Sequence, residues 1–213
     1  MAIGPKLKWI KSQLEDKIYL ISFFVISILL AFLVLKNFNQ NILINTILIS
    51  SALYLFFITL RDFFVKKYKN ISQNIAHFGF SLLILSILFN NLFASEIITN
   101  LKVGETFENS KTKIVFESVD QKKEQNYNAI IANFFISNSN GEEDRLSPEL
   151  RIYNQPVIAT SEADIKTTLM SDKFIVINLV QNQDFFNVRY QVKPFMLWIW
   201  LSVALISFGG IIS

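Results

Sequence analysis

The chain has 213 residues, of which 52% are hydrophobic, with no cysteine, a single histidine and a formal charge of +3. Without cysteine this chain forms no disulfide and no thiolate metal site. With a single histidine as well, it has no zinc cage and no catalytic nucleophile paired with a histidine. The sequence also lacks a glycine-rich phosphate-binding loop.

The apolar residues gather in four stretches, each close to the ~20 residues that a helix needs to cross about 30 Å of hydrocarbon. The stretches are Ile18–Leu35, Ile42–Leu60, Ile75–Phe93 and Phe195–Ser213. Because lipid cannot hydrogen-bond to the backbone, each is predicted to be a transmembrane helix. A cleaved signal peptide is not expected, since a long charged segment precedes the first stretch.

Basic side chains are concentrated on one side of these predicted spans. The segment "RDFFVKKYKNISQN" (61–74) has four of them, whereas "NFNQN" (37–41) has none, and the N-terminal flank contains Lys6, Lys8, Lys11 and Lys17. Positive loops mark the cytoplasmic or matrix side, so the N-terminus is expected there. We therefore divide the chain into an N-terminal flank with three spans (1–95), an extracytoplasmic domain (96–193) and a C-terminal span (194–213).

The charge of the chain follows the same division. Residues 96–193 hold 14 acidic and 11 basic side chains, while the rest of the chain holds 3 acidic and 9 basic ones. The positive excess therefore belongs to the inner rim of the membrane. A surface that binds nucleic acid is not expected.

The predicted outer domain is rich in β-branched and aromatic residues. We predict strands in "TKIVFESV" (112–119), "YNAIIANFFIS" (127–137), "DKFIVINLV" (172–180) and "FFNVRYQV" (185–192). Asn140-Gly141 is typical of a tight hairpin turn. The segment 161–172 is predicted to be a short helix, with Ser161 as its cap. Such strands favour a small sandwich or half-barrel, so the fold class is an α-helical membrane protein with an inserted β-rich domain.

His77 lies at the start of the third apolar stretch. Helical spacing places Ser81, Ile84 and Leu88 on roughly its face, while Gly79 lies on the other side and allows another helix to approach closely. A neutral imidazole in lipid is costly unless its nitrogens find partners. Two interpretations remain open: an axial ligand of haem iron, or a histidine that hydrogen-bonds to a neighbouring helix or lies among the lipid headgroups.

Two further patterns have a functional and a structural interpretation. The carboxylates of "GEED" (141–144) can bind Ca²⁺ weakly, but the ligand spacing of a calcium loop is missing, which favours a solvated turn. Trp198 and Trp200, near the start of the last stretch, are either interfacial anchors or flat surfaces for a porphyrin.

Short segments along the whole chain carry a family resemblance. They are "IGPKLKW" (3–9), "NIAHFGFSLLILSI" (74–87), "NYNA" (126–129), "LSPELRIY" (146–153), "TSEADI" (160–165), "DKFIV" (172–176), "VRYQVKPFMLWIW" (188–200) and Gly209-Gly210. In this order they make the chain similar to the C-terminal part of the cytochrome c-type biogenesis haem lyase family, CcmF.

The resemblance implies a role in attaching haem covalently to apocytochrome c on the outer face of a bacterial or mitochondrial inner membrane. It also implies that His77 is one of two transmembrane axial ligands of a structural haem b. Glu149, Arg151 and Tyr153 match a family pattern, and the resemblance makes them, with the two tryptophans, candidate contacts to a partner or to the haem edge. An ion pair at a sheet edge explains the first three equally well.

The resemblance is partial. The family's tryptophan-rich haem-handling segment, the outer histidines beside it and its second transmembrane histidine have no counterpart in this sequence. The chain is therefore expected to be one portion of a lyase and not catalytic alone. Implied partners are the remaining portion of the lyase, a haem chaperone, a thiol-handling subunit and apocytochrome c. The alternative is a non-catalytic membrane anchor whose outer β-domain docks partners.

Overall fold

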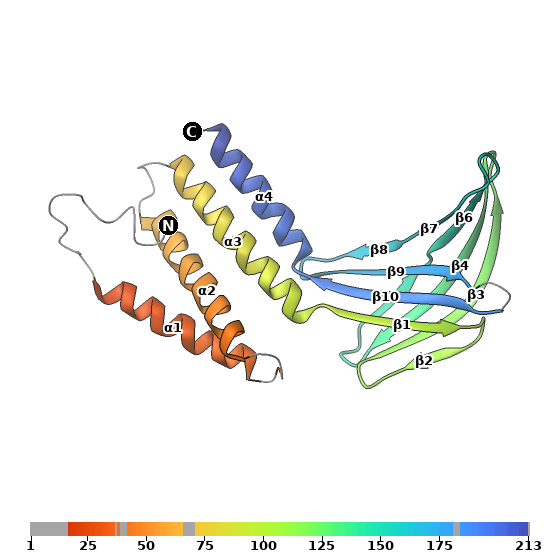
Figure 1. Ribbon diagram of the computed structural model, residues 1–213, viewed down its shortest axis with the longest axis horizontal. Coiled ribbons are helices and arrows are strands. Elements are labelled where there is room, and N and C mark those ends of the chain that lie inside the picture. Colours follow the sequence, from red (N-terminus) through yellow and green to blue (C-terminus); the bar gives the residue numbers. More distant parts are fainter. Residues whose placement is uncertain (1–16, 37, 39–41, 66–70, 181–183, 213) are drawn as a thin grey trace. The chain divides into compact units, whose positions relative to one another are not determined.

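The computed structural model describes residues 17–36, 38, 42–65, 71–180 and 184–212, and the chain divides into two compact units (Figure 1). We call Met1–Leu92 with Phe195–Ser213 the helical unit and Phe93–Pro194 the sandwich unit. The predicted basic flank at Lys6, Lys8 and Lys11, the segment 3–9, and the lysines Lys66, Lys67 and Lys69 lie outside the described residues.

The helical unit contains α1 (Lys17–Leu35), α2 (Ile42–Val65), α3 (Ile71–Phe93) and α4 (Met196–Ile211). The first three are long and apolar enough to cross a membrane, so three of the four predicted spans are confirmed as candidate spans. The fourth is confirmed only as a shorter apolar helix. It has 16 residues and begins at Met196, because strand β10 continues to Pro194 and Phe195 turns the chain with a φ of 61°.

The first three helices of this unit share an apolar core. Its buried members come from all three helices: Ala31, Leu35, Ile49, Ala52, Leu53 and Leu85. In contrast, much of the remaining apolar surface of α1 and α2 is exposed, for example at Leu29 and Leu43. This distribution is typical of helices that meet lipid on one side and other helices on the other.

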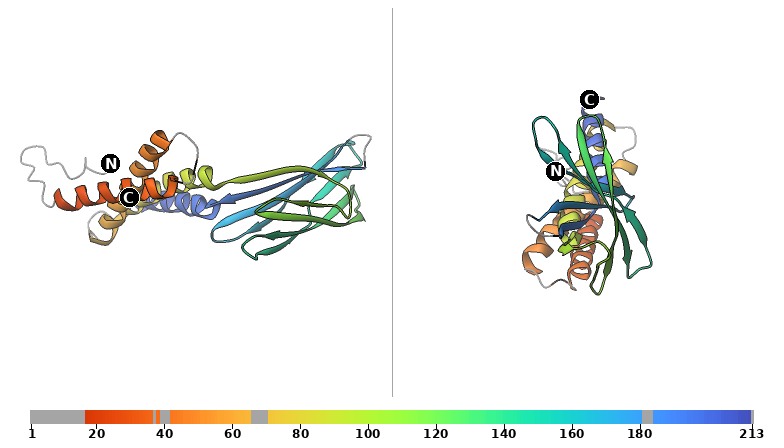
Figure 2. Two further views of the ribbon diagram at one scale, coloured as in Figure 1. Left: turned by 90° about the horizontal axis from the view of Figure 1, so that it is seen from below. Right: turned by 90° about the vertical axis from the view of Figure 1, so that its right-hand side faces the viewer.

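The sandwich unit consists of two antiparallel sheets. The strands are β1 (Ser95–Leu101), β2 (Thr106–Glu108), β3 (Thr112–Lys123), β4 (Tyr127–Asn138), β5 (Glu143–Leu146), β6 (Glu149–Tyr153), β7 (Ala159–Glu162), β8 (Asp164–Thr167), β9 (Ser171–Leu179) and β10 (Phe186–Pro194). One sheet has the order β1-β10-β9-β8; the other has β2-β3-β4-β6-β7, with β5 also paired to β4. Figure 2 shows the strands of this unit from two further sides.

Alternate residues of the long strands fill the space between the sheets. The core contains Ile114, Phe116, Phe134 and Ile136 from one sheet and Ile175, Ile177, Val188 and Tyr190 from the other. Phe116 and Phe134 stack with ring centroids 4.5 Å apart. Alternation with a period of two is the pattern of strands that bury one face, and the sandwich predicted from the β-branched and aromatic residues is confirmed.

The hairpin turn is also confirmed. Gly141 has a φ of 82°, which glycine adopts without steric cost, and its N–H donates to the carbonyl of Asn138 at 2.9 Å. The turn connects β4 to β5, so it determines which side chains of the following segment face the core.

The predicted helix over 161–172 is wrong. The segment forms β7, β8, a turn and the start of β9. Leu150 pairs with Ser161 on one sheet and Ile165 with Phe174 on the other, and the hydroxyl of Ser161 donates to Asn178 rather than capping a helix. Hydrogen bonding to neighbouring strands of the two sheets therefore outweighs the local sequence pattern that favoured a helix capped by Ser161.

Candidate functional site

His77 lies six residues into α3, about 9 Å from the N-terminal end of the helix. Its side chain is half-buried. On a helix with 3.6 residues per turn it falls between two strips of side chains. One strip packs toward α2 and contains Asn74, Phe78, Ser81 and Leu85. The other is exposed and contains Gln73, Phe80, Ile87 and Asn91.

Contacts with α2 fix the first strip. The hydroxyls of Thr59 and Ser81 lie 2.7 Å apart in a buried hydrogen bond. The ring of Phe78 lies 5.6 Å from that of Phe56 and 5.8 Å from that of Phe63, measured between centroids. A polar bond between two ring contacts limits rotation of α3 about its axis, so the side of the helix on which His77 lies is fixed too.

Small residues bring α4 against another side of α3, antiparallel to it (Figure 1). A Cβ on Gly209 would lie 2.8 Å from the backbone nitrogen of Ala76, and one on Gly79 would lie 3.0 Å from the carbonyl oxygen of Ser202. The Ser72 hydroxyl donates to the Gly209 carbonyl at 2.7 Å. The close approach predicted at Gly79 is thus present, and α3 is held on two sides.

The surroundings of His77 suit one ligand bond but not a complete metal site. Within the described part of the chain, its imidazole has no hydrogen-bond partner. No group of three metal-ligating side chains occurs among the described residues. A histidine nitrogen is a usual axial ligand of haem iron, and the exposed strip beside it offers room for a second element. A second imidazole has to come from outside this sequence, which has one histidine.

Glu149, Arg151 and Tyr153 lie on β6, which is inside its sheet between β4 and β7 and not at an edge. Arg151 Nε donates to Glu149 Oε2 at 2.8 Å, and both side chains are half-buried. The guanidinium lies 5.1 Å from the ring centroid of Tyr127, whose ring is 5.4 Å from that of Tyr153. The hydrogen bond with Glu149 raises the pKa of Arg151, so this cluster carries a permanent cation beside the ring of Tyr127.

The two tryptophans of α4 differ in exposure. Trp200 is exposed and Trp198 is half-buried. Two residues apart on a helix, they point to different sides, so one flat ligand cannot stack on both. Their roles as interfacial anchors or haem contacts stay predictions.

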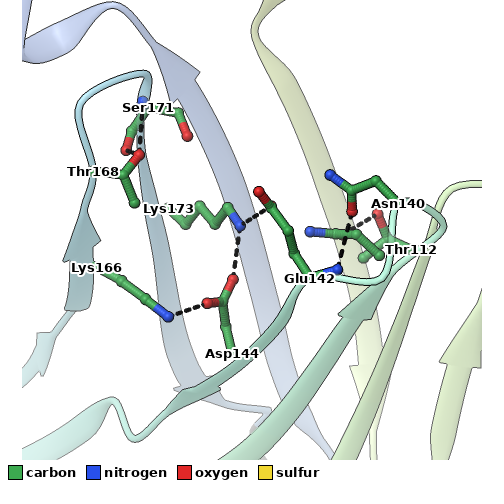
Figure 3. A network of polar contacts seen from close by, with 9 residues as sticks. Thr112, Asn140, Glu142, Asp144, Lys166, Thr168, Ser171 and Lys173 are labelled. Atoms are coloured by element: carbon green, nitrogen blue, oxygen red, sulfur yellow. Dashed lines mark hydrogen bonds and ion pairs between the residues drawn. The ribbon is translucent and has the colours of Figure 1, made fainter.

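A cluster of charges between the sheets was missed by the sequence analysis (Figure 3). Asp144 and Lys173 are only 4% and 6% exposed. Lys173 Nζ donates to Asp144 Oδ2 at 2.8 Å and to Glu142 Oε2 at 2.6 Å, and Lys166 Nζ donates to the other oxygen of Asp144. The cluster therefore joins β5 of one sheet to β8 and β9 of the other.

The lysines decide the ionisation of this cluster. Burial alone would raise the pKa of Asp144, but hydrogen bonds from Lys166 and Lys173 lower it. Burial alone would lower the pKa of Lys173, but its two carboxylate partners raise it. The solvated-turn interpretation is wrong for Asp144, and its oxygens are already occupied by ammonium groups. The sequence pattern that could have identified the buried lysine is "DKFIVINL" (172–179), in which alternation places Lys173 on the core side of the strand with Ile175 and Ile177.

Together, these features define a class: a bundle of apolar helices into which a β-sandwich is inserted between the third and fourth helices, with one available imidazole in the bundle. A family model described as CcmF C-terminal beta-sandwich matches residues 92–194. These residues therefore match the C-terminal β-sandwich of CcmF, and the resemblance of the chain to the C-terminal region of CcmF is confirmed.

Curated proteins that match the whole chain support the same resemblance. The chain is 25% identical to cytochrome c-type biogenesis protein CcmF of Haemophilus influenzae and 20% identical to CcmF of Escherichia coli K12, over 100% of its own length and 35% and 34% of theirs. It is 35% identical to the Rhodobacter capsulatus protein ccl1 over 55% of the chain and 18% of that protein.

A solved structure of "Cytochrome c Heme Lyase CcmF" shares the fold with a TM-score of 0.69 at 17% identity, over 98% of this chain and 36% of that one. The chain thus spans about a third of the length of the relatives it matches.

Proposed function

We propose that this chain is the C-terminal portion of a cytochrome c haem lyase, which supports covalent attachment of haem to apocytochrome c, and that His77 is an axial ligand of a structural haem b. The observation that carries the proposal is the placement of the single imidazole. It lies on a helix fixed on two sides, beside an exposed strip and without a hydrogen-bond partner among the described residues. That arrangement fits a nitrogen kept for a metal.

In this proposal the residues of the chain have separate tasks. Bound haem b would supply a redox-active iron. His77 would hold the iron through an imidazole nitrogen, the packing of Phe78 and Ser81 against α2 would orient the side of α3 that carries the imidazole, and the apolar residues of the exposed strip would exclude water. A second iron ligand would come from the remaining portion of the lyase. The chain alone is not catalytic.

We further propose a topology and a set of partners. The N-terminus lies on the cytoplasmic or matrix side of a bacterial or mitochondrial inner membrane, and residues 96–193 lie on the outer side. The short helix α4 crosses alongside α3, which it contacts at Gly79 and Gly209. The outer sandwich docks the haem chaperone, the thiol-handling subunit or apocytochrome c, with the cluster around Arg151 as a contact.

The haem spectrum of the reassembled lyase tests the ligand assignment. The chain is co-expressed with the remaining portion, purified, and its reduced spectrum recorded for the wild type, His77→Gly and the matched control Gln73→Ala, which lies one turn away on α3. We expect His77→Gly to lose haem b and to regain it when free imidazole is added, while Gln73→Ala keeps it. An unchanged haem b spectrum in His77→Gly would refute the assignment.

The alternative function is a non-catalytic membrane-anchored assembly protein whose outer β-domain docks partners. The half-buried cation of Arg151 beside the paired rings of Tyr127 and Tyr153 favours it, because such clusters suit protein contacts. Arg151→Ala distinguishes the two. If it abolishes co-purification of partners and cytochrome c maturation, while His77→Gly affects neither, the alternative is correct.

A further inference from the structure

The turn between β8 and β9 exposes large apolar side chains. Leu169 and Met170 are 68% and 63% exposed. The turn is ordered by its own hydrogen bonds: the Thr168 hydroxyl donates to the Ser171 carbonyl at 2.8 Å and accepts from the Ser171 N–H at 3.0 Å (Figure 3). Two apolar side chains held outward by a closed turn form a small fixed surface.

The register of the strands places this turn at one particular end of its sheet. Ser171 pairs with Pro194 at the end of β10, and on the other side of β10 Ser95 pairs with Val192. Pro194 lies two residues before α4 begins, and Ser95 lies two residues after α3 ends. Each strand is therefore within about 7 Å of chain of an apolar helix.

We propose that Leu169 and Met170 insert into the interfacial region of the phospholipid bilayer that α3 crosses. The covalent links carry the argument, since they hold this end of the sheet within two residues of helices that meet lipid. Lys193, on the same end of β10, has its ammonium 5.2 Å from the ring centroid of Phe174 and is suited to the phosphate of a headgroup. The inference rests on the membrane assignment of the helices and not on the haem ligand.

Exposure alone does not carry the proposal, because another apolar side chain is more exposed. Val157, between β6 and β7, is 82% exposed. The nearly continuous extended run of β7 and β8 separates it from Leu169 by roughly 30 Å. Of these two segments, the β8–β9 turn lies at the end of the sheet that leads into α3 and α4 and Val157 does not, so Val157 serves as a control.

Spin labelling tests the proposal directly, because the chain has no cysteine of its own. The full chain is reconstituted in vesicles of phosphatidylcholine and phosphatidylglycerol as Met170→Cys and Leu169→Cys, with Val157→Cys as the aqueous control and Leu29→Cys, an exposed residue of α1, as the lipid control. Each nitroxide is measured for its accessibility to oxygen, which partitions into lipid, and to a water-soluble nickel chelate.

We expect the ratio of oxygen to nickel accessibility at both turn positions to be several-fold above that at Val157→Cys and closer to that at Leu29→Cys. A ratio equal to that of Val157→Cys, with a lipid value at Leu29→Cys, would overturn this inference alone. Shielding of the turn from both reagents would also overturn it, since protein would then cover the surface. A water value at Leu29→Cys would overturn the membrane assignment as well.

Discussion

The two units use polar side chains in opposite ways. In the helical unit, many hydroxyls donate to a carbonyl of their own helix: that of Ser27 donates to the carbonyl of Phe23 at 2.7 Å and that of Thr46 to the carbonyl of Ile42 at 2.6 Å. In the sandwich unit, Asp144 and Lys173 are buried and join two sheets. The helices thereby present apolar sides to their surroundings, whereas the sandwich specifies its own packing from within.

The two units also differ in how completely their aromatic side chains are buried. Phe116 and Phe134 of the sandwich are at most 1% exposed, whereas Phe32 and Phe24 of α1 are more than half exposed. A closed core needs no other molecule, while exposed apolar helices are completed by lipid and by other polypeptide segments. The unit that holds the proposed haem ligand is therefore the one that depends on partners.

The largest loss of stability is expected from a substitution that breaks the buried charge cluster of Asp144 and Lys173. Asp144→Asn removes the carboxylate that both lysines share and leaves Lys173 buried with only Glu142. Removing one partner of a buried pair costs 3–5 kcal/mol, and we expect about 3 because one partner remains. Amide hydrogen exchange of β9 in the full chain in micelles measures this loss. The control Glu143→Gln, exposed on the same strand, should change exchange little.

If Asp144→Asn exchanges like the wild type in β9, the cluster does not stabilise the sandwich and the proposed difference between the units is incorrect. If α2 and α3 lose protection to the same extent as β9, the two units unfold together and cannot be compared as separate bodies.

The pH dependence of stability sharpens the same comparison. The pKa values of Asp144 and Glu142 are lowered, so as the pH falls below about 5 the unfolded chain binds protons first and stability is lost. Burial raises the pKa of Tyr190 to about 12, so above about pH 10 the unfolded tyrosine ionises first and stability falls again. The raised pKa of Lys173 acts in the same alkaline direction.

We divide each measured exchange rate by the intrinsic rate at that pH. We expect this ratio to be lowest for β9 and β10 between about pH 5 and pH 10, and to stay nearly constant for the apolar helices. Tyr190→Phe should weaken the alkaline loss and leave the acid loss unchanged. A helical unit that follows the same pH profile would contradict the assignment of this dependence to the cluster.

Much of the fold could be predicted from the sequence because its determinants are local. The strands around Ile114 and Phe134 show a period of two, Gly141 permits the hairpin, and the three long helices are continuous apolar runs. The segment 161–172 could not be predicted, since a local capping pattern competed with pairing to strands distant in the chain. The contact between Asp144 and Lys173 joins residues 29 positions apart and exists only when two sheets face each other.

The candidate site was predictable to a different extent. A lone histidine in an apolar run identified His77, and the spacing of Gly79 predicted the close helix contact. Neither pattern could show that α2 holds the opposite strip of α3 through Thr59, because an exposed and a buried hydroxyl look alike in a helical sequence.

The next effect tests the contact between α3 and α4. Gly209→Ala places a Cβ 2.8 Å from the backbone of Ala76, so the helices must separate, and overpacking of this kind costs about 1–3 kcal/mol. Gly210→Ala is the matched control, since a Cβ there meets nothing within 4 Å and helix propensity favours alanine by up to about 1 kcal/mol. Thermal unfolding of the helical signal in micelles should separate the two. Equal stability would mean that the close approach does not occur.

The smallest effect concerns the hydroxyl pair of Thr59 and Ser81. Each hydroxyl also bonds to its own helix: that of Thr59 lies 2.9 Å from the Leu55 carbonyl, and that of Ser81 lies 2.8 Å from the Phe78 carbonyl. Losing one partner therefore leaves the other satisfied, and interhelical hydrogen bonds in membranes average about 0.6 kcal/mol. A double-mutant cycle of Thr59→Val and Ser81→Ala in the full chain measures the coupling, with exposed Ser51→Ala as the control.

A coupling as large as the loss in Asp144→Asn would contradict this argument, because it would mean that the hydroxyls have no local alternative. The expected difference has a physical cause. A neutral hydroxyl on a helix always has a carbonyl one turn away that can accept its proton, whereas the ammonium of Lys173 in the sandwich core has only the carboxylates that the other sheet supplies. The helical unit can therefore exchange its polar contacts when a partner binds, and the sandwich unit cannot.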